Sequence, residues 1–254
     1  MGHIYEQTVD LSKEQKTPEN RGEIEKSPWH CDGQSMYIKD KYARDRVMKS
    51  TRLLLPYLSQ DDKNPSTILD VGCFTWEARK YFPRNVKYIG IDQTAYHKET
   101  RVMDLNHGFE PIPCSHALIL ETLEHLVDPQ DALESTLASL APEGCLVVSL
   151  PNEANLFYRI RCLLGITDPD CFLGQGKHLH RPSLLQSRRF LEGHCAILKE
   201  LYYISPSGCN SKEEWVGRIL TLIPDTIHQF LANKLPSLFA RGFIFLCKKK
   251  HVSP

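Results

Sequence analysis

Two short apolar runs, each ending at an acidic residue, constrain the fold of this chain more than any other feature. The first reads ILDVGC over residues 68–73, and the second reads VKYIGID over residues 86–92. Short apolar runs rich in β-branched residues and closed by a glycine or an acid are typical of buried parallel strands. Open backbone after Gly72 and a carboxylate at Asp92 therefore predict a nucleotide-type site, where the carboxylate accepts hydrogen bonds from ribose hydroxyls. The G-x-G-x-x-G fingerprint of dinucleotide sites does not occur in the sequence.

The rest of the chain alternates between strand-like and helix-like segments. Strands are expected at 67–71, 86–91, 115–120, 144–150, 197–204 and 241–248, with a weak one near 100–103. Helices are expected at about 40–58, 76–82, 128–141, 153–164, 183–193 and 211–234. This alternation predicts an α/β fold with a mostly parallel sheet and helices on both faces.

The pair ILDVGC and YIGID resembles the S-adenosylmethionine (SAM) site of class I methyltransferases. Family members usually continue as D-x-G-x-G-x-G, whereas the two later glycine positions here are Phe74 and Trp76, so the glycine loop is degenerate. Either ring would occupy space that the ligand normally uses, unless it rotates outward or the loop takes another path. The resemblance implies SAM as cofactor and a Rossmann-like seven-stranded, mostly parallel sheet, with an antiparallel last strand after a helical insert at 211–239. The cofactor contacts that it implies are Asp70, Gly72, Cys73, Phe74, Asp92, Gln93, Asp104, Leu105 and Glu121.

A second stretch, LEHLVDP at residues 123–129, narrows the resemblance. It is similar to a signature of small-molecule methyltransferases, including MetW-like proteins and ubiquinone-pathway O-methyltransferases. Pro129 fits the first turn of a helix that Asp128 caps. In outline the similarity covers residues 40–248, and it implies a small-molecule acceptor, with oxygen as the expected methylated atom.

Glu121, Glu124 and His125 form an E-x-x-E-H pattern, whose side chains can converge on one face of a loop or a first helical turn. Carboxylates and an imidazole can hold Mg²⁺ or Mn²⁺. The spacing is similar to the metal site of small-RNA 2′-O-methyltransferases and of some ubiquinone-pathway enzymes. A further histidine completes the site in the RNA enzymes, so the hypothetical ligands are Glu121, Glu124, His125 and His180, with His178 as an alternative to His180.

Relatives with the same acids and no metal leave another interpretation open, in which Glu124 only caps a helix. Without a metal, His125 or His178 could act as general base, and Glu124 joins them as a candidate catalytic residue. Methyl transfer from a sulfonium needs little beyond in-line geometry, so positioning can supply most of the rate.

Composition excludes several classes of function. Among 254 residues, 41% are hydrophobic and 24% charged, which is typical of a globular domain, and the formal net charge of +0 gives no global attraction for nucleic acid or an anionic membrane. RNA 2′-O-methylation therefore stays a third hypothesis. Nine scattered cysteines without a C-x-x-C pair predict free thiols in the cytoplasm, and no apolar run reaches the length of a membrane span.

Two parts of the chain differ from the expected domain. Residues 1–35 are polar and are predicted to form a flexible segment before a methyltransferase domain at 36–254. The apolar insert at 211–239 is expected to pack on the core or to form a lid over the acceptor; the alternatives are a homodimer surface and a membrane-lying helix. A hypothesis from a different class is a non-catalytic binding or scaffold protein, in which Phe74 and Trp76 fill the methionine end of the pocket.

Overall fold

The computed structural model describes residues 30–31, 34–35, 41–165, 178–204 and 224–250, and the chain divides into two units, Met1–Met36 and Tyr37–Pro254. In the first unit, the described residues form strand β1 (His30–Cys31), which pairs antiparallel with β2 (Gln34–Ser35). The segment predicted to be flexible lies almost entirely outside the described residues, and the prediction stands untested.

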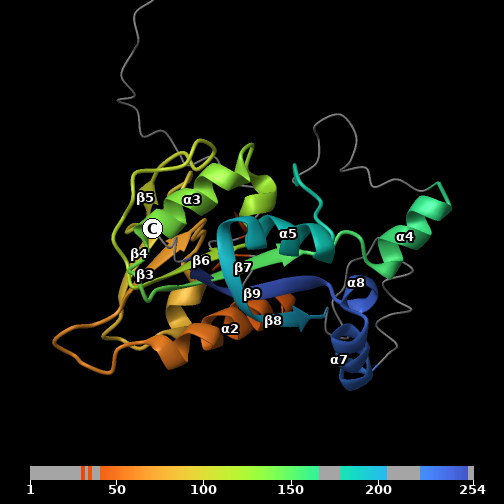
Figure 1. The fold of residues 1–254 in the computed structure, drawn as a ribbon, viewed down its shortest axis with the longest axis horizontal. Coiled ribbons are helices and arrows are strands. Elements are labelled where there is room, and N and C mark those ends of the chain that lie inside the picture. The colour runs from red at the N-terminus through yellow and green to blue at the C-terminus, as the bar shows by residue number, and fades with distance from the viewer. Residues whose placement is uncertain (1–29, 32–33, 36–40, 166–177, 205–223, 251–254) are drawn as a thin grey trace, which may run out of the picture. The chain divides into compact units, whose positions relative to one another are not determined.

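The second unit contains a seven-stranded sheet in the order β5-β4-β3-β6-β7-β9-β8 (Figure 1). Its strands are β3 (Thr67–Val71), β4 (Lys87–Asp92), β5 (Arg101–Val102), β6 (His116–Leu120), β7 (Cys145–Pro151), β8 (Cys195–Tyr203) and β9 (Gly242–Lys249). The first five are parallel to one another, and β9 is antiparallel to both β7 and β8. The chain runs outward from β3 to β5 and then crosses to β6, so a topological switch point lies between β3 and β6, where open α/β sheets bind ligands. The predicted fold class is confirmed.

Helices cover both faces of the sheet, as Figure 1 shows for α3 and α5 on one face and α2 on the other. The helical elements are α2 (Lys41–Leu54), η1 (Leu55–Tyr57), η2 (Glu77–Tyr81), η3 (Leu123–His125), α3 (Pro129–Ser139), α4 (Leu156–Leu163), α5 (Leu184–His194), α7 (Asp225–Lys234) and α8 (Pro236–Phe239). Side chains of β3 alternate between two apolar clusters, with Leu69 joining Leu133 of α3 and Ile68 joining Leu54 of α2. The sheet is therefore buried on both sides, which explains the continuous apolar runs in its strands.

Local sequence signals set several helix ends. The Asp128 carboxylate accepts hydrogen bonds from the backbone N–H groups of Gln130 (3.0 Å) and Asp131 (3.4 Å), and Pro129 occupies the first turn of α3, as predicted. The helix predicted at 76–82 is instead the short 3₁₀ helix η2. Pro83 disfavours the helical region for Phe82, which is extended at φ −99° and ψ 149°, and so η2 ends at residue 81.

Helices α7 and α8 lie between β8 and β9, so the described part of the predicted insert is helical. Residues 211–223 of the insert lie outside the described residues. Among the helices of the described ranges, none combines the length and the apolar character that crossing a bilayer requires.

Candidate active site

The loop after β3 keeps a left-handed backbone at each position where the family pattern has glycine. The φ angles are +76° at Gly72, +42° at Phe74 and +61° at Trp76. Glycine is required at the first position, because a Cβ atom there would lie 2.2 Å from Thr122 Oγ1. A left-handed residue other than glycine costs on the order of 1–3 kcal/mol, so surrounding contacts must hold Phe74 and Trp76 in place.

The Trp76 indole packs on the face of β4. Its Nε1 donates a hydrogen bond to Thr100 Oγ1 (3.1 Å), and its ring stacks on His97 at 4.3 Å and tilts against Tyr88 at 5.0 Å. Gly90 makes room for the indole, since a Cβ atom there would lie 2.5 Å from Trp76 Nε1. The ring therefore lies against strand positions that precede the tip of β4 and is 8% exposed.

Asp92 at the tip of β4 connects the two loops of the predicted cofactor site. Its Oδ2 accepts the backbone N–H of Phe74 at 3.0 Å, and its Oδ1 accepts that of Thr94 at 3.1 Å. Burial raises the pKa of the Asp92 carboxyl, and these backbone hydrogen bonds oppose the rise. A carboxylate has about four acceptor positions, so two backbone bonds leave capacity for ribose hydroxyls. The Phe74 ring tilts against Tyr96 at 4.5 Å.

Asp70, on β3, is more deeply buried than Asp92, with exposed fractions of 3% and 9%. The Tyr88 hydroxyl donates a hydrogen bond to Asp70 Oδ2. Burial raises the pKa of Asp70 to about 7, the nearby charge of Asp92 adds to the rise, and the Tyr88 hydrogen bond opposes it. Cys73 is also buried, with its Sγ 3.7 Å from Thr100 Oγ1. Both predicted cofactor contacts are therefore buried, and their contacts with the cofactor stay predictions.

The remaining predicted contacts follow β4 and β5. Gln93 is exposed directly after Asp92. Asp104 is also exposed, and its Oδ1 accepts two hydrogen bonds of 2.9 Å from the backbone and side chain of Asn106, which lower its pKa. Leu105 is buried in the core. Their contacts with the cofactor stay predictions.

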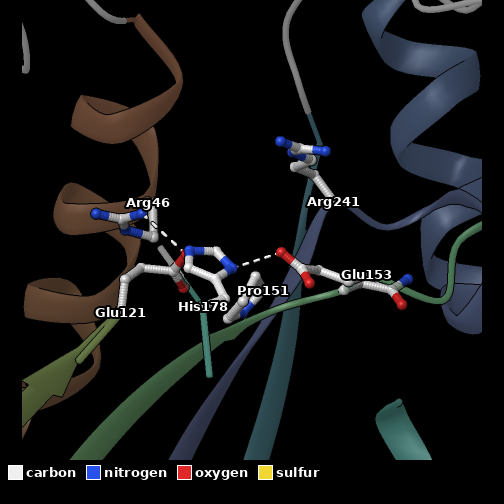
Figure 2. A pocket seen from close by; sticks show the side chains of 7 residues that line it. Arg46, Glu121, Pro151, Glu153, His178 and Arg241 are labelled. Atoms are coloured by element: carbon white, nitrogen blue, oxygen red, sulfur yellow. Dashed lines mark hydrogen bonds and ion pairs between the residues drawn. The ribbon is translucent and has the colours of Figure 1, made fainter. Parts of the chain in front are cut away.

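A second region of interest is a polar cavity of about 180 Å³ at the carboxyl ends of β6 and β7 (Figure 2). Its lining residues come from α2, from the ends of these strands, from the residue before β9 and from the segment before α5. They are Arg46, Glu121, Pro151, Asn152, Glu153, His178 and Arg241.

Glu121 joins three elements around this cavity. Its Oε2 forms an ion pair with Arg46 Nη1 of α2 at 3.3 Å, and its Oε1 accepts hydrogen bonds from Ser149 Oγ (3.1 Å) and Tyr203 OH (2.9 Å). The two charged side chains are only 9% and 5% exposed. The Tyr203 side chain packs against Gly242, since a Cβ atom at residue 242 would lie 2.0 Å from the Tyr203 hydroxyl oxygen. Glu121 itself has a φ of +50°, which fits a backbone held by these contacts.

Glu124, His125 and His178 come together, with one potential ligand atom from each within 4.8 Å of the others. The Glu124 side chain is fully buried, its Oε1 lies 4.0 Å from His125 Nε2, and neither of its oxygens has a hydrogen-bond partner within the described ranges. Burial, together with the charge of Glu121, raises the pKa of Glu124 well above its usual value.

The backbone fixes the position of the histidine segment. The carbonyl oxygen of Glu124 accepts the N–H groups of Leu179 (2.8 Å) and His180 (3.0 Å). His180 turns its Nε2 to the Leu126 carbonyl oxygen at 2.9 Å and is not part of the three-residue cluster. Of the predicted metal ligands, the structure brings Glu124 and His125 together with the alternative His178, whereas Glu121 and His180 contact other groups.

Comparison with known proteins decides the family. A family model described as a methyltransferase domain matches residues 40–199. The chain belongs to this family. It is a class I SAM-dependent methyltransferase, and SAM is its cofactor. A search of curated proteins finds no significant match.

Solved structures share the methyltransferase fold at low sequence identity. A SAM-dependent methyltransferase from Archaeoglobus fulgidus has a TM-score of 0.50 at 18% identity, with 84% of this chain and 97% of that chain covered. The N-methyltransferase NodS from Bradyrhizobium japonicum, in complex with S-adenosyl-L-homocysteine, has a TM-score of 0.52 at 13% identity, covering 87% and 94%. A putative methyltransferase from Haloferax volcanii, in complex with the Trm112 activator, has a TM-score of 0.53 at 15% identity, covering 84% and 94%.

Three charged residues of this methyltransferase site escape prediction from the sequence: Arg46, Glu153 and Arg241. Glu153 follows the predicted strand at 144–150 by three residues, and an acid at the carboxyl end of a parallel strand is a usable signal. The two arginines carry no such signal, because they reach the cavity from α2 and from the residue before β9, far from the recognised motifs.

Proposed function

We propose that this methyltransferase transfers the SAM methyl group to a hydroxyl oxygen of a small molecule that enters the polar cavity. The observation that carries the proposal is the imidazole of His178, which lines the cavity and is hydrogen-bonded through Nδ1 to Glu153 (Figure 2). A polar cavity of about 180 Å³ next to the carboxyl edge of the sheet suits an acceptor smaller than a macromolecule.

The proposed step is an in-line displacement at the methyl carbon. A bond forms between the acceptor oxygen and the methyl carbon, the sulfur–carbon bond breaks, and its electron pair stays on sulfur to give neutral S-adenosylhomocysteine. The acceptor hydroxyl loses its proton, and His178 is placed to accept it, because an imidazole can act as a base near neutral pH.

On the cofactor side, we propose that Asp92 binds the ribose hydroxyls and that Asp104 binds the adenine amino group. Packing of the Trp76 indole on β4 supports cofactor binding, since the ring contacts Tyr88 and lies over Gly90 instead of projecting beyond the strand tips. The Asp104 Oδ2 atom supports the adenine contact, since both hydrogen bonds that the described residues donate to this carboxylate fall on Oδ1.

The test is a methyl-labelling experiment. Purified protein is incubated with ¹³C-methyl SAM and a fractionated metabolite extract, and labelled products are identified by mass spectrometry and NMR. His178→Gln is expected to lower product formation at least tenfold while SAM affinity, measured by calorimetry, is retained. His194→Gln on α5 is the matched control. A label on nitrogen or sulfur would overturn O-methylation, and SAM binding without any product would favour the scaffold hypothesis.

A bound divalent cation is a second candidate, favoured by the buried Glu124 carboxylate and its two neighbouring histidines. A metal held by Glu124, His125 and His178 would polarise the acceptor hydroxyl. One carboxylate and two imidazoles suit Mn²⁺, Fe²⁺ or Zn²⁺ better than Mg²⁺. Titration with Mn²⁺, followed by loss of the free-ion signal in electron paramagnetic resonance, should show a single site that Glu124→Gln abolishes and the exposed control Glu110→Gln keeps. Equal signals for all three proteins would exclude the site.

A further inference from the structure

We infer that Glu153 is a positioning residue that fixes the tautomer of His178. We infer further that Arg181 makes this tautomer depend on a carboxylate, and not merely an amide, at position 153. The inference rests on the proposed role of His178. It holds for His178 as a base and as a metal ligand, because both roles need a lone pair on Nε2.

The Glu153 carboxylate bridges two cationic or proton-donating groups through different oxygens. Its Oε1 accepts a hydrogen bond from His178 Nδ1, and its Oε2 forms an ion pair with Arg181 Nε at 3.2 Å. The Glu153 side chain is 9% exposed, so solvent competes weakly for either oxygen. Oε2 accepts no hydrogen bond from the described residues, so its contact with Arg181 is electrostatic. A carboxylate oxygen can only accept, and the bond to Oε1 therefore places the imidazole proton on Nδ1 and leaves Nε2 unprotonated in the neutral ring.

The backbone on both sides of this bridge is held firmly. Asn152, one residue before Glu153, donates its N–H to the Arg241 carbonyl oxygen and its Nδ2 to the Ala240 carbonyl oxygen, both at 2.8 Å. On the other side, the Glu124 carbonyl oxygen binds the two N–H groups that follow His178. Neither the acid nor the imidazole can shift far without breaking backbone hydrogen bonds, so the bridge restricts mainly the ring rotation and the tautomer.

The bridging arrangement predicts an unusual effect of glutamine at position 153. An amide has one oxygen and one NH₂ group, so it cannot offer an acceptor on both sides. The cationic Arg181 attracts the amide oxygen, because a guanidinium has donors and no acceptor. The NH₂ group then faces His178, whose Nδ1 must become the acceptor, and the proton moves to Nε2. Glu153→Gln should therefore reverse the tautomer and not merely weaken the contact.

Removing Arg181 should undo this reversal. In the double variant Glu153→Gln/Arg181→Met the amide oxygen is released to accept from His178 Nδ1, and the original tautomer should return. Arg181→Met alone should keep the original tautomer, because the carboxylate still accepts on that side.

The test reads the tautomer directly, with no acceptor substrate. Long-range ¹H–¹⁵N correlation spectra of ¹⁵N-histidine-labelled full-length protein show which ring nitrogen carries the proton. The His178 signals are assigned as those that disappear in the His178→Gln variant. We expect Nδ1–H in wild type, Arg181→Met and the double variant, and Nε2–H in Glu153→Gln. An Nδ1–H signal in Glu153→Gln, or no return in the double variant, would overturn the inference. Thermal unfolding of each variant checks that the fold is retained, and the exposed control Glu110→Gln should leave the His178 tautomer unchanged.

Kinetics supply a second readout. Glu153→Gln should lower kcat about 10–100-fold, the range typical of residues that orient a histidine, with KM and SAM affinity within about threefold of wild type. The double variant should regain part of the lost kcat. If tautomers follow the expected pattern and kcat does not, the positioning inference stands and the proposed role of His178 fails. If His178→Gln is inactive while Glu153→Gln leaves the tautomer unchanged, the proposed role of His178 stands and the positioning inference fails.

Discussion

We call the predicted cofactor site at the ends of β3 and β4 the crevice; it and the polar cavity hold their carboxylates in different ways. In the crevice, at the ends of β3 and β4, Asp92 receives backbone N–H groups and Asp70 receives a tyrosine hydroxyl. In the cavity, at the ends of β6 and β7, Glu121 is paired with a guanidinium. The crevice residues lie within one stretch of about 35 residues, whereas the cavity collects side chains from positions 46 to 241. The crevice is thus built by local backbone geometry, and the cavity by charge pairs between distant segments.

This difference predicts how each region fails. Loss of a side chain in the crevice should act through packing and loop conformation. Loss of one partner in the cavity should leave a buried charge without compensation, which is costly even though an intact buried pair contributes little net stability.

The largest expected effect belongs to the crevice. Trp76→Ala removes a buried indole that stacks on His97 and fills the space beside Gly90, so we expect a loss of about 3–5 kcal/mol in the free energy of unfolding. Urea denaturation followed by circular dichroism measures it, with the exposed substitution Gln93→Ala as control. A loss below about 1 kcal/mol would mean that the indole does not pack tightly against β4 and His97.

In the cavity, Arg46→Met should cost about 3–4 kcal/mol, because it leaves the buried Glu121 carboxylate without its cation. The exposed Arg44→Met on the same helix should change the free energy of unfolding by less than about 0.5 kcal/mol. The double variant Arg46→Met/Glu121→Gln should recover at least half of the loss in the same urea titration. If it recovers none, the cost comes from the packing of α2 and the contrast between the two regions weakens.

The same contrast explains which features could be predicted from the sequence. The strands at 67–71 and 86–91 and the cap at Asp128 follow from local patterns, and the structure confirms them. The left-handed backbone at Phe74 could not be predicted, because residue preferences oppose it and contacts from the next loop impose it. The cavity pairs depend on where α2 and the segment before α5 pack, and no local spacing in the sequence encodes that.

Asp92→Asn tests the crevice as a cofactor site. The amide cannot accept from both Phe74 and Thr94 and also serve the ribose, so we expect SAM affinity to fall about 100-fold, the equivalent of roughly 2.7 kcal/mol. Isothermal calorimetry measures the change, with the exposed Asp62→Asn as control. Unchanged affinity in a folded variant would remove Asp92 from the cofactor contacts.

Asp70→Asn should change the pH dependence of stability. The folded-state pKa of about 7 lies above the unfolded value, so the neutral carboxyl stabilises the fold below about pH 4, and this contribution is lost as pH rises through about 7. The asparagine side chain does not ionise, so the variant does not lose this stability as pH rises. We expect its free energy of unfolding to exceed that of wild type by about 1–2 kcal/mol at pH 8, with the difference vanishing towards pH 4. Thermal unfolding over pH 4–8 measures it. Parallel curves for the two proteins would show that Asp70 is ionised throughout, as an exposed acid would be.

The smallest expected effect is that of Phe74→Gly, and it bears most directly on how the degenerate glycine loop works. Glycine relieves a left-handed φ at a gain of about 1 kcal/mol, while the lost ring contact with Tyr96 costs about as much, so the free energy of unfolding should change by less than about 0.5 kcal/mol. SAM affinity should stay within about threefold, because the Phe74 N–H that binds Asp92 remains. An increase in SAM affinity above tenfold would show that the ring occupies ligand space in the wild-type protein. The crevice would then restrict its cofactor through a side chain, as the cavity is expected to restrict its acceptor, and the distinction between a backbone-built and a side-chain-built region would no longer hold.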